Sequence, residues 1–356
     1  MTAYEPSSIE EAQAVLRSGA RFCLAGGGTA VAAQPGVDVL RTGRLNRILD
    51  YNALDQVVTV EAGVTLAALQ RELAAKGQRL ALDPPLPARA TLGGIIAANS
   101  FGPLRARYGS VRDLIIGISI LRADGTQAKG GGKVVKTVAG FDLPKLMCGS
   151  FGTLGLIVTA TFRVHPLAEA TQDVIRRGLD AAAVVATVAA LRAGQFEPAA
   201  VVATRVPGGL YDVAVRFEGF AAGVGQQISR FQAEPAPGDI WAVHEQVRCA
   251  GPVRLKIAAL PTDLPRVEAA LAPLGGAFSW YATLGLGFIS GDLDLAAIDM
   301  ARRSLAGLRG SVVVEAGPEG LDRWGPPPAS LALHKSVKAR LDPQGVFAPG
   351  RFVGGL

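Results

Sequence analysis

Residues 21–29 read Arg-Phe-Cys-Leu-Ala-Gly-Gly-Gly-Thr, an apolar run that leads directly into three consecutive glycines. The apolar residues predict a short strand, and the loop after it begins at Gly26. Because glycine has no Cβ, the backbone of such a loop can approach a ligand closely. Its N–H groups can also converge on a phosphate without any lysine. The stretch therefore predicts a strand followed by a loop that binds the anionic part of a ligand, although simple turn glycines would give the same pattern.

Strand and helix signals surround this loop. Ser7-Ser8-Ile9-Glu10-Glu11 has the pattern of a capping box before a short helix. Thr65 and Thr91 are placed to begin two further helices, the second of them rich in small residues. Strands are expected at residues 57–61, 114–122 and 156–164. The first 165 residues are therefore expected to form one mixed α/β unit.

The pattern changes after His165-Pro166, where alanine-rich helical stretches alternate with short strands. We expect a second domain there. Near the end, residues 331–341 predict a helix, and a compact turn-rich tail follows from Asp342 to Arg351. The predicted organisation is a first domain at 1–166, a second at 167–330 and a C-terminal segment at 331–356.

The composition argues against several classes of protein. The chain has 356 residues, 49% hydrophobic and 19% charged, which is typical of a globular protein. The net charge is +6, but no basic block with interleaved aromatic residues occurs, so we expect no nucleic-acid binding. Acidic residues near the N-terminus do not fit a secretory signal. The uncharged run 269–291 is broken by prolines and glycines, so we expect no membrane span.

Other catalytic motifs are incomplete. Gly26–Val31 lacks the last glycine of the dinucleotide fingerprint, and Gly130-Gly131-Gly132-Lys133 is followed by valine where a phosphate loop needs Ser or Thr. The histidines, His165, His244 and His334, are too scattered for a local metal motif, and the serine-nucleophile elbow is absent. Three cysteines lie far apart, which favours a reducing, cytoplasmic setting and no disulfide framework. We therefore expect no dedicated metal and no hydrolytic chemistry.

Taken together in their order, several segments resemble the vanillyl-alcohol oxidase type of flavoprotein, with its PCMH-type FAD-binding domain. The resemblance is closest to the FAD-binding subunits of bacterial glycolate oxidases. It is carried by residues 24–29, 90–97, 108–113, 131–147, 149–155 and 341–351. It implies an α+β fold, with a PCMH-type FAD-binding domain of two α/β subdomains and a smaller α+β cap domain. The C-terminal segment would return to the FAD-binding domain.

The resemblance also implies the positions that hold the cofactor. The first loop would surround the FAD pyrophosphate, the second would lie beside the pyrophosphate and flavin, and backbone groups of residues 152–157 would face the other side of the cofactor. The expected cofactor-binding residues are Gly26, Gly27, Gly28, Thr29, Thr91, Gly93, Gly94, Arg107, Gly152 and Ile157. Some members attach flavin through a histidine in the first loop, but no histidine precedes His165, so we expect non-covalent FAD.

Two departures from the family pattern bear on function. Ala348 stands where the closing motif usually has Asn, and the histidine-rich metal motif of the catalytic relatives that oxidise 2-hydroxy acids is absent. The resemblance therefore implies an FAD-binding subunit of a glycolate oxidase-like 2-hydroxyacid dehydrogenase complex. A larger FAD-containing subunit would perform most substrate chemistry, and an iron–sulfur subunit would accept electrons. Any membrane association would be peripheral, at the inner membrane and through partners.

Two alternatives remain open at this stage. The chain could be a self-sufficient flavoenzyme of the same fold that oxidises another alcohol or a lactone, or a non-catalytic assembly subunit. Oxidation of a 2-hydroxy acid needs a base near the hydroxyl, a cation for the carboxylate and a hydride acceptor. FAD would supply only the acceptor, and no residue is assigned as the catalytic base.

Overall fold

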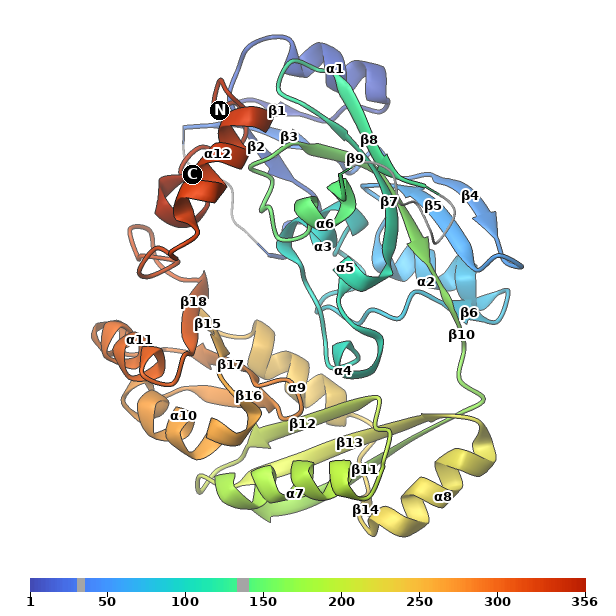
Figure 1. Ribbon diagram of the computed structural model, residues 1–356, viewed down its shortest axis with the longest axis vertical. Coiled ribbons are helices and arrows are strands. Elements are labelled where there is room, and N and C mark those ends of the chain that lie inside the picture. The colour runs from blue at the N-terminus through green and yellow to red at the C-terminus, as the bar shows by residue number, and fades with distance from the viewer. Residues whose placement is uncertain (31–35, 133–140) are drawn as a thin grey trace. The chain divides into compact units, whose positions relative to one another are not determined.

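The computed structural model describes residues 1–30, 36–132 and 141–356. Contacts within the chain define two compact units, coloured along the sequence in Figure 1. Unit 1 comprises Met1–Gly102, Tyr108–Leu167 and Pro327–Leu356, and unit 2 comprises Pro103–Arg107 and Ala168–Pro326. The domain boundaries proposed from the sequence differ from these units by one residue near 167 and by four residues near 330, and residues 103–107 cluster with unit 2. Arg107 explains part of that difference, since its Nη1 donates to the carbonyl of Glu197.

The N-terminal part of unit 1 is a small parallel sheet. Its order is β1 (Ala3–Tyr4), β3 (Asp38–Arg41) and β2 (Phe22–Ala25). Helix α1 (Ile9–Leu16) begins at Ser8, whose hydroxyl accepts the N–H of Glu11 as the capping pattern predicts. Leu16, Phe22 and Leu40 are buried in the core between this helix and the sheet.

A five-stranded antiparallel sheet forms the rest of unit 1. Its order is β4 (Ile48–Asn52), β5 (Val57–Glu61), β9 (Leu156–Arg163), β7 (Ile115–Leu121) and β8 (Gln127–Gly131). It packs through a common core on α2 (Leu66–Ala74), α3 (Leu92–Ala98), α5 (Val111–Leu114) and α6 (Leu143–Met147). Thr65 and Thr91 cap α2 and α3, which confirms both helix starts. A short pair, β6 (Gln78–Arg79) with β10 (His165–Pro166), completes the unit.

Unit 2 is built on an eight-stranded antiparallel sheet. Its order is β14 (Glu234–Pro235), β11 (Ala170–Leu179), β13 (Tyr211–Gly219), β12 (Ala200–Arg205), β16 (Ala277–Tyr281), β17 (Leu286–Gly291), β15 (Val253–Ala258) and β18 (Ser311–Ala316). One face carries the core beneath α7 (Ala181–Ala193), α8 (Ala221–Phe231), α10 (Leu264–Leu271) and α11 (Ile298–Ala306). The α+β class expected from the sequence is therefore correct.

Helix α9 (Ile240–Cys249) packs on the opposite face of the unit 2 sheet. Side chains alternate between the two faces of a strand, so Tyr281 points away from the core that contains its neighbour Trp280. The Tyr281 hydroxyl lies 2.9 Å from Nε2 of His244 and accepts a hydrogen bond of 3.2 Å from Nη1 of Arg248. Burial, together with the nearby Arg248 charge, lowers the pKa of His244 from 6.5 to about 3.

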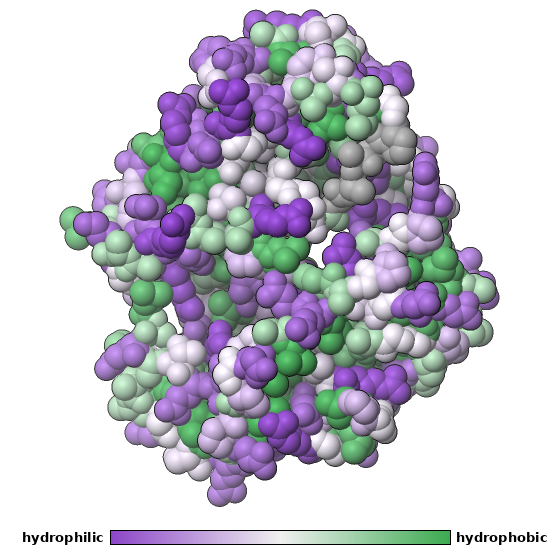
Figure 2. All heavy atoms as spheres, turned by 180° about the vertical axis from the view of Figure 1, so that it is seen from behind, coloured by the Kyte–Doolittle hydropathy of each residue, from purple (hydrophilic) through white to green (hydrophobic). Residues whose placement is uncertain are grey.

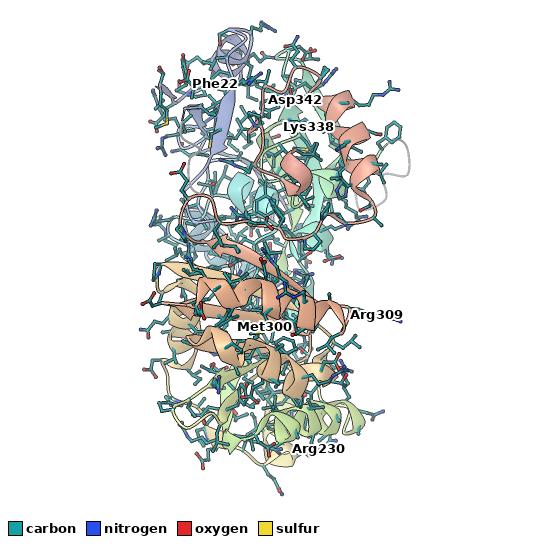
Figure 3. All side chains as sticks on the ribbon, turned by 90° about the vertical axis from the view of Figure 1, so that its left-hand side faces the viewer. Phe22, Arg230, Met300, Arg309, Lys338 and Asp342 are labelled. Carbon is teal, nitrogen blue, oxygen red and sulfur yellow. The ribbon has the colours of Figure 1, made fainter. Side chains whose placement is uncertain are left out.

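The C-terminal segment begins with α12 (Leu331–Leu341), belongs to unit 1 and contains a buried ion pair. Nζ of Lys338 lies 2.6 Å from a carboxylate oxygen of Asp342, whose side chain is 0% exposed. Lys338 also donates to the carbonyl oxygens of Thr153 and Phe347, and Asp342 accepts the N–H groups of Val346 and Phe347. Figure 3 shows Lys338 and Asp342 on this segment. The hydrogen bonds fix the path of the turn-rich tail.

Among the described residues, no helix combines the length and apolar character needed to cross a bilayer. The uncharged run 269–291 contains a short 3₁₀ turn at Ala272–Leu274, β16 and β17, as its prolines and glycines predict. On the face shown in Figure 2, hydrophilic and hydrophobic residues are interspersed over the surface.

We expect Lys338→Met to destabilise the protein by about 3 kcal/mol or more, because it leaves the buried Asp342 carboxylate without its cation. The matched control is Lys145→Met, since the Lys145–Asp142 pair is equally close at 2.7 Å but its side chains are 48% and 52% exposed. That control should cost less than about 1 kcal/mol. Urea unfolding of both full-length variants measures the difference, and equal losses would contradict the structural role of the buried pair.

His244 should make stability depend on pH. Its pKa falls from 6.5 to about 3 on folding, so between these values the unfolded chain binds a proton that the folded chain does not. This contribution is therefore fully present above pH 6.5 and is lost as the pH falls toward 3. The expected slope is about 1.4 kcal/mol per pH unit. Urea unfolding between pH 6 and 4 should show a correspondingly smaller slope for His244→Gln than for the unaltered protein, whereas identical slopes would exclude this source of acid sensitivity.

Candidate functional site

The loop after β2 lies directly against the segment that precedes α3. A Cβ placed on Gly27 would lie 1.7 Å from the carbonyl oxygen of Arg89, and a Cβ on Gly26 would lie 2.1 Å from Oγ1 of Thr91. Side chains at these two positions would force the two segments apart. The sequence predicted that these glycines let the loop approach a ligand closely. In the structure Gly26 and Gly27 instead lie against the segment before α3, and this contact shapes the adjoining pocket.

A pocket in unit 1 opens beside this contact. The glycine loop, the start of α3 and the segment before β9 provide most of its wall. Its lining comprises Leu24, Ala25, Gly26, Gly27, Gly28, Thr29, Ala30, Thr42, Gly93, Gly94, Ala97, Ala98, Phe151, Gly152, Gly155, Leu156, Ile157 and Arg351. The wall is thus made of glycine backbone, small residues and a few larger apolar side chains, and Arg351 is the one residue with an ionised side chain among the described lining residues.

The polar groups of the two glycine segments differ in availability. The Gly93 N–H donates to the carbonyl of Ala62 at 2.8 Å, and the Gly94 N–H donates to Oγ1 of Thr91 at 3.3 Å. Gly93 and Gly94 therefore contribute space rather than hydrogen-bond donors. In the described parts of the chain, no acceptor takes the N–H groups of Gly27 or Gly28. The first loop is consequently the segment whose backbone can donate to an anion.

The opposite wall depends on a left-handed backbone at Gly152, where φ is +73°. That conformation favours glycine, and it brings the chain past Leu24 before β9 begins. Thr153 stabilises the turn by donating its hydroxyl to the carbonyl of Ser150 at 2.7 Å. Ile157, the last predicted site residue in the chain, lies on β9 and lines the same pocket.

The structure brings most of the predicted site residues together, with two exceptions. Thr91 does not line the pocket, but it caps α3 and contacts Gly26 at its edge. Arg107 belongs to unit 2, where its Nη2 lies 3.6 Å from the Glu197 carboxylate, and it is not among the lining residues. Its part in cofactor binding stays a prediction without support from the pocket.

Two polar residues of the lining, Thr42 and Arg351, are not among the expected cofactor-binding residues. Thr42 follows β3, and its N–H donates to the carbonyl of Ala25 at 3.0 Å, so parallel pairing of β2 and β3 delivers it to the pocket. Arg351 belongs to the closing motif of the C-terminal segment, which the resemblance returns to the FAD-binding domain, but the sequence does not decide whether its side chain contacts the cofactor. Residues 133–140, which belong to the long family-like segment 131–147, lie outside the described residues, and so does that part of the prediction.

The lining is chemically suited to a flat, partly anionic cofactor. Apolar walls at Ala97, Phe151 and Leu156 can contact an aromatic ring, while the Gly27 and Gly28 N–H groups and the Arg351 guanidinium can bind negative charge. An ideal Cβ on Gly28 would meet nothing nearer than Arg89 Nη2 at 3.9 Å. The first loop therefore borders open space on one side and tightly packed backbone on the other.

Comparisons with known proteins agree with this chemistry. Residues 3–131 match the family model described as an FAD binding domain. The chain is 30% identical over 317 residues to the glycolate oxidase subunit GlcE of Escherichia coli, covering 85% of this chain and 84% of that protein.

Other relatives match about half of the chain. The D-2-hydroxyglutarate dehydrogenase of Xanthomonas citri is 38% identical over 45% of this chain and 35% of its own length. The glycolate oxidase subunit GlcD of Bacillus subtilis is 35% identical over 51% of this chain and 38% of its own length. Among solved structures, alkyldihydroxyacetonephosphate synthase has a TM-score of 0.72 at 17% identity, covering 98% of this chain and 77% of that chain, and therefore shares the fold.

The long match to GlcE defines the family, and the FAD binding domain defines the cofactor. The chain belongs to the family of the glycolate oxidase subunit GlcE and is an FAD-dependent oxidoreductase.

Proposed function

We propose that this chain is the FAD-binding subunit of a complex that oxidises glycolate, or a similar 2-hydroxy acid, to the 2-oxo acid. The observation that carries the proposal is the pocket beside the Gly26–Gly28 loop, in a chain that matches GlcE of Escherichia coli along most of its length. The names of two shorter matches, D-2-hydroxyglutarate dehydrogenase and glycolate oxidase subunit GlcD, refer to the same class of substrate.

We place the cofactor in this pocket. When bound, the flavin supplies the acceptor for a hydride from the substrate. The N–H groups of Gly27 and Gly28 hold the diphosphate, and Thr29 continues the same loop. Gly93, Gly94 and Gly152 leave room for the cofactor between the two walls, and Ile157 closes one side. Exclusion of water by this lining strengthens the hydrogen bonds to the diphosphate.

The cofactor is held without a covalent bond in this proposal. The residues that line the pocket, as far as the structure describes it, include no histidine, cysteine or tyrosine to which a flavin ring could be attached. Binding then depends on shape, backbone hydrogen bonds and charge. A dissociable cofactor also agrees with the absence of any histidine before His165 in the sequence.

The proposed partners are a larger FAD-containing catalytic subunit and an iron–sulfur subunit. They follow from the family resemblance and from the subunit names of the GlcE and GlcD relatives. Large hydrophobic side chains are exposed at several positions, including Leu54 at 95%, Phe141 at 97% and Phe220 at 82%. Scattered exposure of this kind is common on protein surfaces, so the proposed partners rest on the resemblance and on the names of the relatives. The proposed location is cytoplasmic, with membrane association only through the partners.

The purified protein should contain about one FAD per chain, and denaturation should release it into solution because no covalent bond retains it. The visible absorption spectrum before and after denaturation measures the content, and chromatography identifies the released chromophore. Substrate oxidation by the isolated chain with an artificial acceptor would favour a self-sufficient enzyme over a subunit. A folded protein that is colourless and does not bind added FAD would contradict the proposal.

Gly27→Ala should weaken FAD binding at least about tenfold, because the new Cβ must displace the Arg89 carbonyl and with it the wall of the pocket. The matched control is Gly43→Ala, in the same unit, where a Cβ would meet nothing within 4 Å. Fluorescence titration of the two apo-proteins with FAD measures the dissociation constants. Equal affinities in folded Gly27→Ala and Gly43→Ala would place the cofactor elsewhere.

A further inference from the structure

The pocket contains very little side-chain charge for a cofactor that is anionic. At neutral pH the diphosphate of FAD carries about two negative charges, and burial of unpaired charge is costly. Arg351 is the one residue with an ionised side chain among those that line the pocket in the described structure. The other polar side chains of the lining are the hydroxyl groups of Thr29 and Thr42, which are neutral.

Contacts with both walls fix the position of the Arg351 guanidinium. Nη1 donates to the carbonyl of Leu24 at 3.3 Å and to the carbonyl of Phe151 at 3.4 Å. Nη2 contacts Sγ of Cys23. Leu24 lies two residues before the glycine loop, and Phe151 immediately precedes Gly152. The residue is only 8% exposed. The cation is therefore held at the base of the glycine loop, where no acceptor in the described structure takes the N–H groups of Gly27 and Gly28.

The tail that carries Arg351 pairs with β2, the strand that leads into the glycine loop. Phe22 and Phe347 form a parallel bridge, in which the Phe22 N–H donates to the carbonyl of Val346 and the Ala348 N–H donates to the carbonyl of Phe22. The buried Asp342 carboxylate fixes the N–H groups of Val346 and Phe347 from the other side. Arg351 thus reaches the pocket on a segment whose backbone is positioned before any ligand binds, which reduces the entropy cost of binding.

We propose that Arg351 binds the diphosphate of FAD and that the C-terminal segment therefore completes the cofactor site. This inference rests on the proposed location of FAD in the pocket. A guanidinium can donate two parallel hydrogen bonds to phosphate oxygens, and the first glycine loop donates backbone N–H groups from the adjacent wall. The apolar part of the cofactor then contacts the remaining described lining, which carries no charged side chain.

Arg351→Gln tests the proposal, with Arg21→Gln as the matched control because Arg21 is an exposed arginine at the start of the same strand region. Apo-proteins are titrated with FAD and with riboflavin, which has the same ring system but no phosphate. Arg351→Gln should weaken FAD binding about 10- to 100-fold, the range expected for a charge-assisted hydrogen bond. Riboflavin affinity should change less than about twofold, and Arg21→Gln should resemble the unaltered protein for both ligands.

Two further readouts separate the diphosphate from the flavin ring. The dependence of FAD affinity on KCl concentration should become shallower in Arg351→Gln, since an ionic contact has been lost. The midpoint potential of the bound flavin should stay at that of the unaltered protein. Arg351→Lys keeps the charge and should retain part of the affinity and of the salt dependence. It also provides the test if the glutamine variant does not fold, as judged by circular dichroism.

Unchanged FAD affinity in folded Arg351→Gln would overturn the proposal, and so would an equal loss of riboflavin and FAD affinity. A shifted midpoint potential with unaltered FAD affinity would place Arg351 at the flavin ring and also overturn it. The Gly27→Ala and Gly43→Ala pair tests the location of the cofactor separately. If Gly27→Ala loses FAD while Arg351→Gln does not, the pocket is correct and only the role of Arg351 is wrong.

Discussion

The close approach of the first glycine loop to the segment before α3 is the constraint on which the site depends. A Cβ on Gly27 would overlap the carbonyl oxygen of Arg89, so the two backbones can meet only if that side chain is absent. Thr91 takes part on both sides of this contact, because its hydroxyl caps α3 and also lies against Gly26. The start of the helix and the path of the loop are therefore set together, and the loop lines the pocket from Gly26 to Thr29.

A second constraint arises at the other end of the chain. The tail after α12 has little regular structure, so its backbone N–H groups need other partners. The Asp342 carboxylate accepts two of them and is neutralised by Lys338, which also donates to the carbonyl of Thr153 in the wall segment before β9. The hydrogen bond from Lys338 to Thr153 thereby connects the last segment of the chain to the segment before β9. The buried ion pair also positions the tail that carries Arg351.

Local signals allowed much of unit 1 to be predicted. Ser8, Thr65 and Thr91 are helix caps because a hydroxyl can satisfy an N–H at a helix start, and that requires only nearby residues. The location of Arg107 could not be predicted from the sequence. Its neighbours in sequence belong to unit 1, yet it contacts Glu197, which lies far along the chain. No motif in either segment indicates that contact. Thr42 was missed for a similar reason, since only the pairing of β2 with β3 brings it to the pocket.

The sequence by itself determined the strand before the glycine loop, the helix starts, the absence of a local metal motif and, through the order of its motifs, the family and its cofactor. These properties depend on residue type and short spacing. Only the tertiary structure decided which groups face the pocket. The N–H groups of Gly93 and Gly94 already have protein acceptors, whereas the Arg351 guanidinium reaches the pocket from the far end of the chain. Which residues distant in sequence become hydrogen-bond partners depends on how whole helices and strands pack together. The local sequence carries no pattern that predicts this packing.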